Sequence, residues 1–226
     1  MFLFETSIRG AIALKLYDLS HPFSVDDMVF PGTPAMEYRL THTFEEGAFS
    51  LGLASINTHA GTHTDAPRHF LQDGATLEAV PLSHYVGPCV VVDVRHRGAE
   101  EDITLEDIRA YEDTISVKQR VLFLTGWSTR VNTPEYFTDY PRISLEVAER
   151  LVELGVVLMG VEPPSLNPPL YIEVHRALSK HGVAIIEGLC GLDAILDKEV
   201  IFCGAPLAFA GADGFPVRAY AIELEA

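Results

Sequence analysis

The histidines and the aspartate between positions 59 and 69 are the side chains of this sequence best suited to chemistry. His59, His63 and His69 fall within eleven residues, although the 226-residue chain has only nine histidines, and Asp65 lies among them. Imidazole and carboxylate groups are the usual protein ligands of zinc, manganese and iron, and a catalytic site uses about three of them and keeps one position open for water. The segment therefore predicts a catalytic site for a divalent metal ion.

The spacing of these side chains sets conditions on the backbone. His63 and Asp65 are two residues apart, so an extended chain directs both to the same side. His59 precedes His63 by four residues, and an extended chain would separate them by ~13 Å, too far for ligands of one ion. The chain must turn between them, which Gly61 permits, and Pro67 fixes its direction afterwards. The alternative, that such histidines cap turns or lie on the surface, suits a single histidine better than this cluster.

A second histidine and carboxylate pair lies nearer the C-terminus. In the helix expected over residues 171–180, His175 shares the apolar face with Ile172 and Leu178. Glu187 ends an apolar run, and burying its carboxylate is costly without a partner such as a metal ion. A lone histidine on an apolar face is more often a core residue, so the residues alone leave both interpretations of His175 open.

The elements that must position these groups follow from apolar runs and their boundaries. The predicted strands cover residues 14–19, 37–44, 50–57, 89–95, 120–125, 156–161, 183–186, 200–203 and 217–224. One helix begins at Thr104 with a capping box to Asp107, and another begins at the N-cap Ser144 and ends by Gly155. The block from 59 to 70 is expected to be irregular. These elements indicate one α/β or α+β domain with mixed sheets over residues 1–226.

Composition excludes several classes of partner. The chain has 32 acidic and 16 basic residues and a formal net charge of −16, which argues against nucleic acid and anionic membranes as partners. The first 19 residues are interrupted by Glu5, Arg9 and Lys15, so they do not resemble a signal peptide. The three cysteines lie in apolar or small-residue runs without a CxxC pair. They predict buried free thiols and a cytoplasmic location.

The segment HAGTHTDAPRHF at 59–70 resembles the HxGTHxDxPxHF signature of the cyclase family, whose best-known members are bacterial-type kynurenine formamidases. The resemblance extends over most of the chain. DLSHPF at 18–23 and FPGTP at 30–34 are similar to the N-terminal segments of the family, and His175 and Glu187 resemble its second pair of metal ligands. Two departures are Phe30, where the family often has Trp, and Glu162, which replaces Asp in a GxDxxS element.

The resemblance implies a centre of two divalent metal ions, zinc or in some members manganese. His59, His63 and Asp65 would hold one ion. Asp65 would bridge to a second ion held by His175 and Glu187.

The resemblance also implies roles outside the metal shell. His69 would be the general acid and base, and Phe30 would supply an aromatic wall for the substrate. The implied fold is a swivelling β/β/α type with mixed, barrel-like sheets and peripheral helices, and the implied assembly is a homodimer or homotetramer.

The function predicted on these grounds is hydrolysis of a small-molecule amide by metal-activated water. The substrate would be N-formylkynurenine or a related N-formyl aryl amine, split into amine and formate. Two alternatives remain. The chain would hydrolyse a cyclic amide of the isatin or lactam type, or it would be a metal-stabilised binding module without catalysis.

Overall fold

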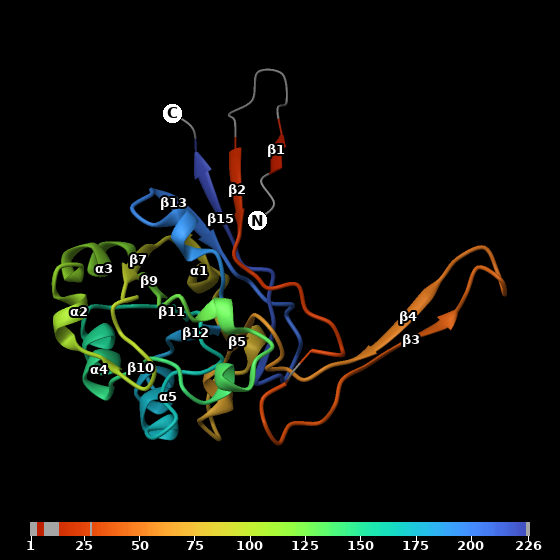
Figure 1. The fold of residues 1–226 in the computed structure, drawn as a ribbon, viewed down its shortest axis with the longest axis horizontal. Helices are drawn as coiled ribbons and strands as arrows, with labels where there is room; N and C mark the ends of the chain where they lie inside the picture. Colours follow the sequence, from red (N-terminus) through yellow and green to blue (C-terminus); the bar gives the residue numbers. More distant parts are fainter. Residues whose placement is uncertain (1–3, 7–13, 28, 225–226) are drawn as a thin grey trace.

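A six-stranded mixed sheet forms the middle of the molecule. The computed structural model describes residues 4–6, 14–27 and 29–224 and is drawn as a ribbon in Figure 1. The strand order is β14-β5-β12-β11-β9-β7. β7, β9, β11 and β12 run parallel, whereas β5 is antiparallel to both of its neighbours. The strands are β5 (His63–Asp65), β7 (Val90–Asp93), β9 (Arg120–Leu124), β11 (Leu158–Val161), β12 (Ala184–Glu187) and β14 (Gly214–Pro216).

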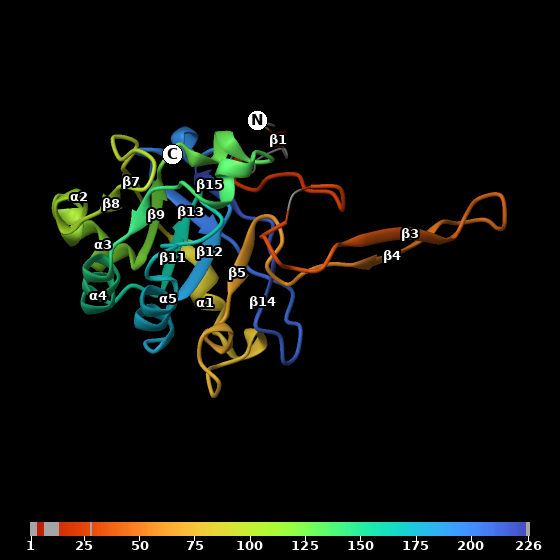
Figure 2. The ribbon, with the colours of Figure 1, turned by 60° about the horizontal axis from the view of Figure 1, so that its bottom comes forward.

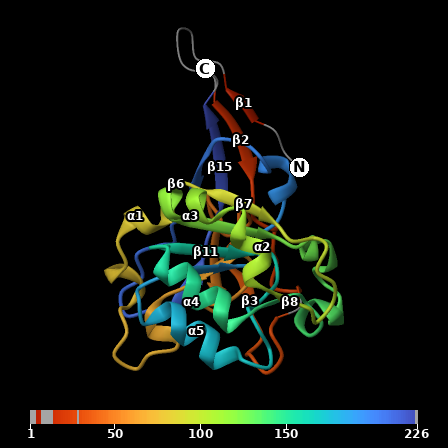
Figure 3. The same ribbon diagram turned by 90° about the vertical axis from the view of Figure 1, so that its left-hand side faces the viewer.

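Helices cover one face of this sheet. Along β9, Val121 and Phe123 point into the core beneath the helices, because successive side chains of a strand point to opposite faces. Val147 of α4 and Val174 of α5 belong to the same core, and Figure 3 shows these helices side by side. The helices on this face are α2 (Leu105–Arg109), α3 (Glu112–Lys118), α4 (Leu145–Glu153) and α5 (Tyr171–Ser179). The short helix α1 (Leu82–Tyr85) instead contributes Tyr85 to the core on the opposite face.

A second sheet covers the other face. Leu122 and Leu124 of β9 point to that side and share a core with Phe202 and Ala221. Every pairing in this sheet, of order β1-β2-β15-β13-β6, is antiparallel. Its strands are β1 (Phe4–Thr6), β2 (Leu14–Asp18), β6 (Val86–Pro88), β13 (Val200–Cys203) and β15 (Tyr220–Leu224). The layers are thus an antiparallel sheet, a mixed sheet and helices, which confirms the predicted mixed α/β class.

Two small sheets lie outside these layers. β8 (Asp102–Ile103) and β10 (Arg142–Ile143) form a short parallel pair. β3 (Glu37–His42) and β4 (Leu51–Ser55) form a hairpin that projects from the body of the molecule, as Figures 1 and 2 show. No helix within the described ranges is long and apolar enough to cross a membrane.

Several predicted elements have the expected boundaries. β13 is confirmed at both ends, and α5 ends one residue before the predicted position. α2 begins with the predicted capping box, in which the Thr104 amide donates to Asp107 Oδ2 at 2.7 Å. Cys89, Cys190 and Cys203 are free thiols, as predicted, and Cys190 is only half-buried.

Other predictions are corrected. Residues 217–224 are not one strand, because the chain leaves the central sheet after Pro216 and enters the second sheet only at Tyr220. The block from 59 to 70 is not irregular throughout: it contains β5 and a 3₁₀ turn, Pro67–His69. The hairpin strands are shorter than predicted, and α3 follows α2 as a separate helix. Most of the N-terminal segment tested as a signal peptide lies outside the described residues.

Candidate metal centre and active site

Two adjacent strands of the central sheet carry the centre. β5 and β12 are antiparallel with Glu187 opposite His63 and Ile185 opposite Asp65. His63, Asp65 and Glu187 are 3–4% exposed, so the strand pairing alone brings an imidazole and two carboxylates together inside the protein. Buried carboxylates require partners, and each of these two has imidazole nitrogens around it.

The side chain of His63 presents one defined nitrogen to the carboxylates. Its Nδ1 donates to the carbonyl oxygen of Gly61 at 2.9 Å, which leaves Nε2 with the lone pair. Nε2 lies 3.4 Å from Glu187 Oε2 and 3.6 Å from Asp65 Oδ1. Gly61 makes the required turn with φ of +60°, a conformation that glycine adopts at little cost.

His175 approaches the same carboxylates from α5. Its side chain is 1% exposed, and its Nδ1 donates to the Tyr171 carbonyl oxygen at 2.6 Å. Nε2 is therefore the nitrogen that faces Glu187 Oε1 at 3.2 Å and Asp65 Oδ2 at 4.0 Å. The ring of Phe70 stacks on that of His175, with centroids 4.1 Å apart, and this contact fixes the orientation of the imidazole.

This donor set fits a divalent metal ion. The ligand atoms of His63, Asp65 and Glu187 all lie within 4.8 Å of one another. Backbone carbonyls hold the Nδ1–H groups of His63 and His175, as in metal sites where the second ring nitrogen of a ligand is fixed by a hydrogen bond. The two Nε2 lone pairs therefore converge on two carboxylates, an arrangement suited to coordinating a cation.

A second cluster continues the centre towards solvent. His59 Nδ1 lies 2.8 Å from Asp65 Oδ1, and its Nε2 lies 3.1 Å from Asp213 Oδ2. His69 Nδ1 lies 3.1 Å from the same Asp213 oxygen, and the rings of His59 and His69 are 3.8 Å apart. Sequence analysis did not identify Asp213, which precedes β14 and reaches the centre only because β14 pairs with β5.

The charges of the centre favour a bound cation. Burial would raise the pKa of Asp65, but the hydrogen bond from His59 and the surrounding imidazoles hold it well below its ordinary value. The hydrogen bonds from His59 and His69 likewise lower the pKa of Asp213. Burial would lower the pKa of His59, yet its bonds to Asp213 and Asp65 raise it to about 10. The carboxylates of Asp65 and Asp213 are thus ionised at neutral pH, and they attract positive charge, which the His59 imidazole carries here.

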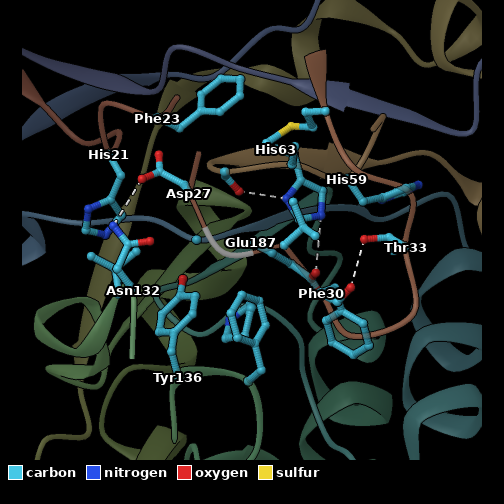
Figure 4. A pocket seen from close by; sticks show the side chains of 18 of the residues that line it. His21, Phe23, Asp27, Phe30, Thr33, His59, His63, Asn132, Tyr136 and Glu187 are labelled. Carbon is cyan, nitrogen blue, oxygen red and sulfur yellow. Dashed lines mark hydrogen bonds and ion pairs between the residues drawn. The ribbon is translucent and has the colours of Figure 1, made fainter. Parts of the chain in front are cut away.

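An aromatic pocket opens above the centre. Its lining includes His59, His63, His69 and Glu187 on the inner side. Figure 4 shows rings around the opening near Glu187. The aromatic lining residues are Phe23, Phe30, Tyr136, Phe137 and Tyr171.

Phe30 is part of this wall, as the sequence predicts for its position. Its ring meets that of Phe137 edge to face at 6.0 Å. The turn from Phe30 to Thr33 holds it, since the Thr33 hydroxyl donates to the Phe30 carbonyl oxygen at 2.8 Å and Gly32 has φ of +91°. The side chains of Asp27 and Asn132, which hydrogen-bond at 3.2 Å, give the pocket a polar flank.

Glu162 and Trp127 lie beside the site without lining the pocket. The carboxylate of Glu162 is buried and accepts hydrogen bonds from the amides of Thr125 and Gly126 and the hydroxyl of Ser128. Burial raises the pKa of Glu162. The carboxylate of Glu162 thus stabilises a turn. The indole of Trp127 is buried and donates to the Tyr136 carbonyl oxygen.

The structure brings all six predicted metal and acid–base residues to one place. His63, Asp65, Glu187 and His175 form its buried part, and His59 and His69 form the part nearer the pocket. The residues that sequence analysis missed are Asp213 and most of the aromatic wall.

Comparison with known proteins finds relatives that all belong to one group of hydrolases. Residues 17–168 match the family model described as “Putative cyclase”. The chain is 33% identical to a kynurenine formamidase of Bacillus cereus (strain ATCC 10987 / NRS 248) over 205 residues, which are 89% of this chain and 94% of that protein. It is 32% identical to the kynurenine formamidase of Bacillus anthracis over 208 residues, 91% and 96% of the two chains.

Solved structures share the fold. Isatin hydrolase A from Labrenzia aggregata, bound to benzyl benzoate, superposes with a TM-score of 0.83 at 23% identity and 94% coverage of both chains. A predicted metal-dependent hydrolase from Bacillus stearothermophilus gives a TM-score of 0.73 at 27% identity, covering 93% of this chain and 99% of that one. With the family model spanning two thirds of its length and curated relatives above 30% identity, this chain belongs to the cyclase family.

Proposed function

We propose that this chain is a metal-dependent hydrolase that cleaves the C–N bond of a small aryl amide, such as an N-formyl aryl amine. The observation that carries the proposal is the convergence of the His63 and His175 Nε2 atoms on two buried carboxylates, directly beneath an aromatic pocket. The names of the curated relatives, kynurenine formamidases, support the reaction class.

We propose that the centre binds two divalent metal ions, either zinc or manganese. His59, His63 and Asp65 would hold one ion, and Asp65 would bridge to a second ion held by His175 and Glu187. Two facts support this division. Asp65 has imidazole nitrogens beside both oxygens, and its Oδ1 and Oδ2 face different histidines. Nitrogen and oxygen donors of this kind suit zinc and manganese.

In the mechanism, bound metal would polarise the substrate carbonyl and increase the acidity of water. His69 lies at the pocket lining, and its ligand atom lies within 4.8 Å of those of His59 and Asp65, but the buried group of His63, Asp65 and Glu187 forms without it. It would accept a proton from water and deliver one to the leaving amine, so that one water and one amide yield an amine and a carboxylate. The aromatic wall, including Phe30, would hold an aryl group beside this centre and exclude water.

The test is a hydrolysis assay with metal analysis on purified protein. The substrates are formanilide, N-formylkynurenine, isatin and a simple lactone, each assayed before chelation, after chelation and after addition of Zn²⁺ or Mn²⁺. We expect stoichiometric divalent metal and chelator-sensitive turnover of a formyl aryl amine. Turnover of isatin alone would replace the proposal with a cyclic-amide hydrolase. Stoichiometric metal without turnover of any substrate would favour a binding module, and folded protein without affinity for these ions would contradict the metal centre.

We also infer that the hairpin of β3 and β4 joins two copies of the chain. A two-stranded hairpin is at best marginally stable alone in water, yet this one projects from the body with Tyr38 58%, Leu40 48% and Leu53 52% exposed. The strand register places Tyr38 and Leu40 on one face and Leu53 on the other. An identical hairpin is a self-complementary partner for such a surface, because each copy offers both the apolar faces and the strand edges that the other requires.

The oligomeric state tests this inference directly. Light scattering of the eluting protein should give a dimer or tetramer for the wild type and a monomer for the double variant Leu40→Lys, Leu53→Lys. The control is Val117→Lys on α3, an apolar residue that is 80% exposed and lies outside the hairpin. A monomeric wild type at micromolar concentration, or a double variant that stays dimeric, would overturn it.

A further inference from the structure

Asp213 comes to the centre by strand pairing and not by sequence proximity. It directly precedes β14, whose Gly214 pairs with Asp65 of β5. The backbone amide of Ala66 also donates to the Asp213 carbonyl oxygen at 2.8 Å. The backbone that follows Asp65 is therefore tied to the backbone of Asp213, and this bond fixes the position of the Asp213 carboxylate relative to the centre.

A single carboxylate oxygen of Asp213 accepts from two imidazoles. Oδ2 lies 3.1 Å from His59 Nε2 and 3.1 Å from His69 Nδ1. The other oxygen, Oδ1, accepts from the Thr58 hydroxyl at 3.1 Å. All contacts that orient the Asp213 side chain thus lead to the 58–69 segment.

The backbone next to Asp213 is shaped for this contact. A Cβ atom at Gly214 would lie 2.5 Å from His59 Cε1 and 2.6 Å from the Thr64 carbonyl oxygen. Only glycine leaves room at this position for the imidazole of His59 to lie against the strand. The position of the His59 ring therefore depends on the chain at 213–214 as well as on its own turn at Gly61.

From this geometry we infer that Asp213 is a positioning residue that sets the tautomer of His69 and the orientation of both His69 and His59. A carboxylate that accepts from Nδ1–H of His69 leaves Nε2 of that ring as the proton acceptor for the pocket. The same oxygen lies 3.1 Å from Nε2 of His59, and this contact holds the His59 ring with its Nδ1 directed at Asp65. The inference rests on the proposed function for the role of His69, but the tautomer that it assigns does not depend on turnover.

The coupling has a mechanical consequence. His59 and His69 stack with centroids 3.8 Å apart and share one acceptor, so neither ring can rotate without losing a hydrogen bond or the stacking contact. A metal ligand and the acid–base group are thereby held at a fixed distance from each other. Carboxylates that orient functional histidines in this way affect activity or metal affinity by ~10–100-fold when replaced.

The first test uses the conservative variant Asp213→Asn, with Asp113→Asn on α3 as the control for loss of a carboxylate elsewhere. Assayed with saturating Zn²⁺, Asp213→Asn should lower kcat by ~10–100-fold, change KM by less than about threefold and unfold at the wild-type temperature. In the His69→Ala background, still with saturating Zn²⁺, the same substitution should lower kcat by less than about threefold, because the proton-transfer group that Asp213 positions is gone and the excess metal offsets any loss through His59. Independent, multiplicative losses in the double variant would overturn the inference.

The second test needs no substrate. Nitrogen-15 spectra of the histidine rings of the zinc-loaded protein should show His69 with a protonated Nδ1 and an unprotonated Nε2. In Asp213→Asn the Nε2–H form should gain population. A wild-type His69 in the Nε2–H form would overturn the inference even in an active enzyme. The expected tautomer in an inactive protein would leave it standing while the proposed function fails. A loss of bound zinc equal to that in Asp65→Asn would instead make Asp213 a ligand and would also overturn it.

Discussion

The metal centre and the segment from 21 to 55, which contributes Phe23 and Phe30 to the pocket and forms the hairpin, differ in burial and in secondary structure. His63, Asp65, Glu187 and His175 lie on strands and a helix of the main layers, are almost fully buried, and have fixed hydrogen-bond partners. The segment from 21 to 55 is mostly loop and hairpin, and large apolar side chains along it are exposed. Rigid elements thus carry the groups that must keep their geometry, whereas the exposed segment carries groups that meet a substrate or a second chain.

This difference separates two kinds of mutational effect. Substitutions in the centre should abolish metal binding or turnover, because each side chain there contacts several other groups and no neighbouring residue can replace it. Substitutions in the exposed segment should alter substrate affinity or assembly while leaving the chemistry intact. Each prediction below compares one region with the other.

The largest effect is expected for Asp65→Asn. Asp65 faces His59, His63 and His175, so the change removes the negative charge at the point where three imidazoles meet. We expect loss of most bound metal and a fall in turnover of more than about 10⁴-fold. Metal analysis and single-turnover assays measure both quantities, and Asp113→Asn is the control. If the Asp65→Asn protein were active and held its full metal content, Asp65 would not be a metal ligand.

The next effect is expected for His69→Ala. Because the buried ligand set does not need this imidazole, the variant should retain its metal and lose ~10²–10⁴-fold in kcat as a missing acid–base group. His42→Ala, a histidine in the exposed hairpin, is the control and should leave turnover unchanged. Loss of metal together with normal activity after reconstitution would show that His69 is a ligand and not the acid–base group.

The sequence predicted the centre better than its surroundings, and the reason is physical. The 59–69 ligands are close in the chain, so their spacing alone constrains one turn, and Glu187 ends a clearly apolar strand. Asp213 gives no such signal, because it lies in a glycine-flanked turn and reaches His69 across 144 residues through strand pairing. Tyr136 and Phe137 belong to a 3₁₀ turn, whose length is too short for a periodic pattern. Contacts that depend on strand register or on short turns therefore could not be predicted from sequence patterns.

A pair of leucine-to-alanine variants compares the stability of the two regions. Leu122 is fully buried in the central sheet, and its removal should lower the free energy of unfolding by ~2–5 kcal/mol. Leu53 in the hairpin is half exposed, and its removal should cost less than about 0.5 kcal/mol at low protein concentration. Urea unfolding at two protein concentrations measures both. If the hairpin joins two chains, the Leu53 effect should grow with concentration, because association stabilises only the folded state.

The smallest effect on the reaction is expected at the wall, for Phe30→Ala. The ring of Phe30 is partly exposed and meets Phe137 edge to face, so its loss removes apolar contact with an aryl group and leaves the metal ligands in place. Burial of an aromatic contact of this size corresponds to ~1–2 kcal/mol. We therefore expect KM for an aryl amide to rise about tenfold and kcat to change less than about threefold.

The control variants decide whether Phe30 acts through its ring. Phe30→Leu keeps an apolar side chain on the same turn and should recover part of the affinity, whereas Val117→Ala on α3 should change neither constant. The ratio of the KM for formanilide to the KM for a non-aromatic formamide should rise in Phe30→Ala, because only the aryl substrate loses a partner. If kcat fell and KM did not, Phe30 would be acting on the reacting groups, and the division between a centre that performs the chemistry and a wall that selects the substrate would be wrong at this residue.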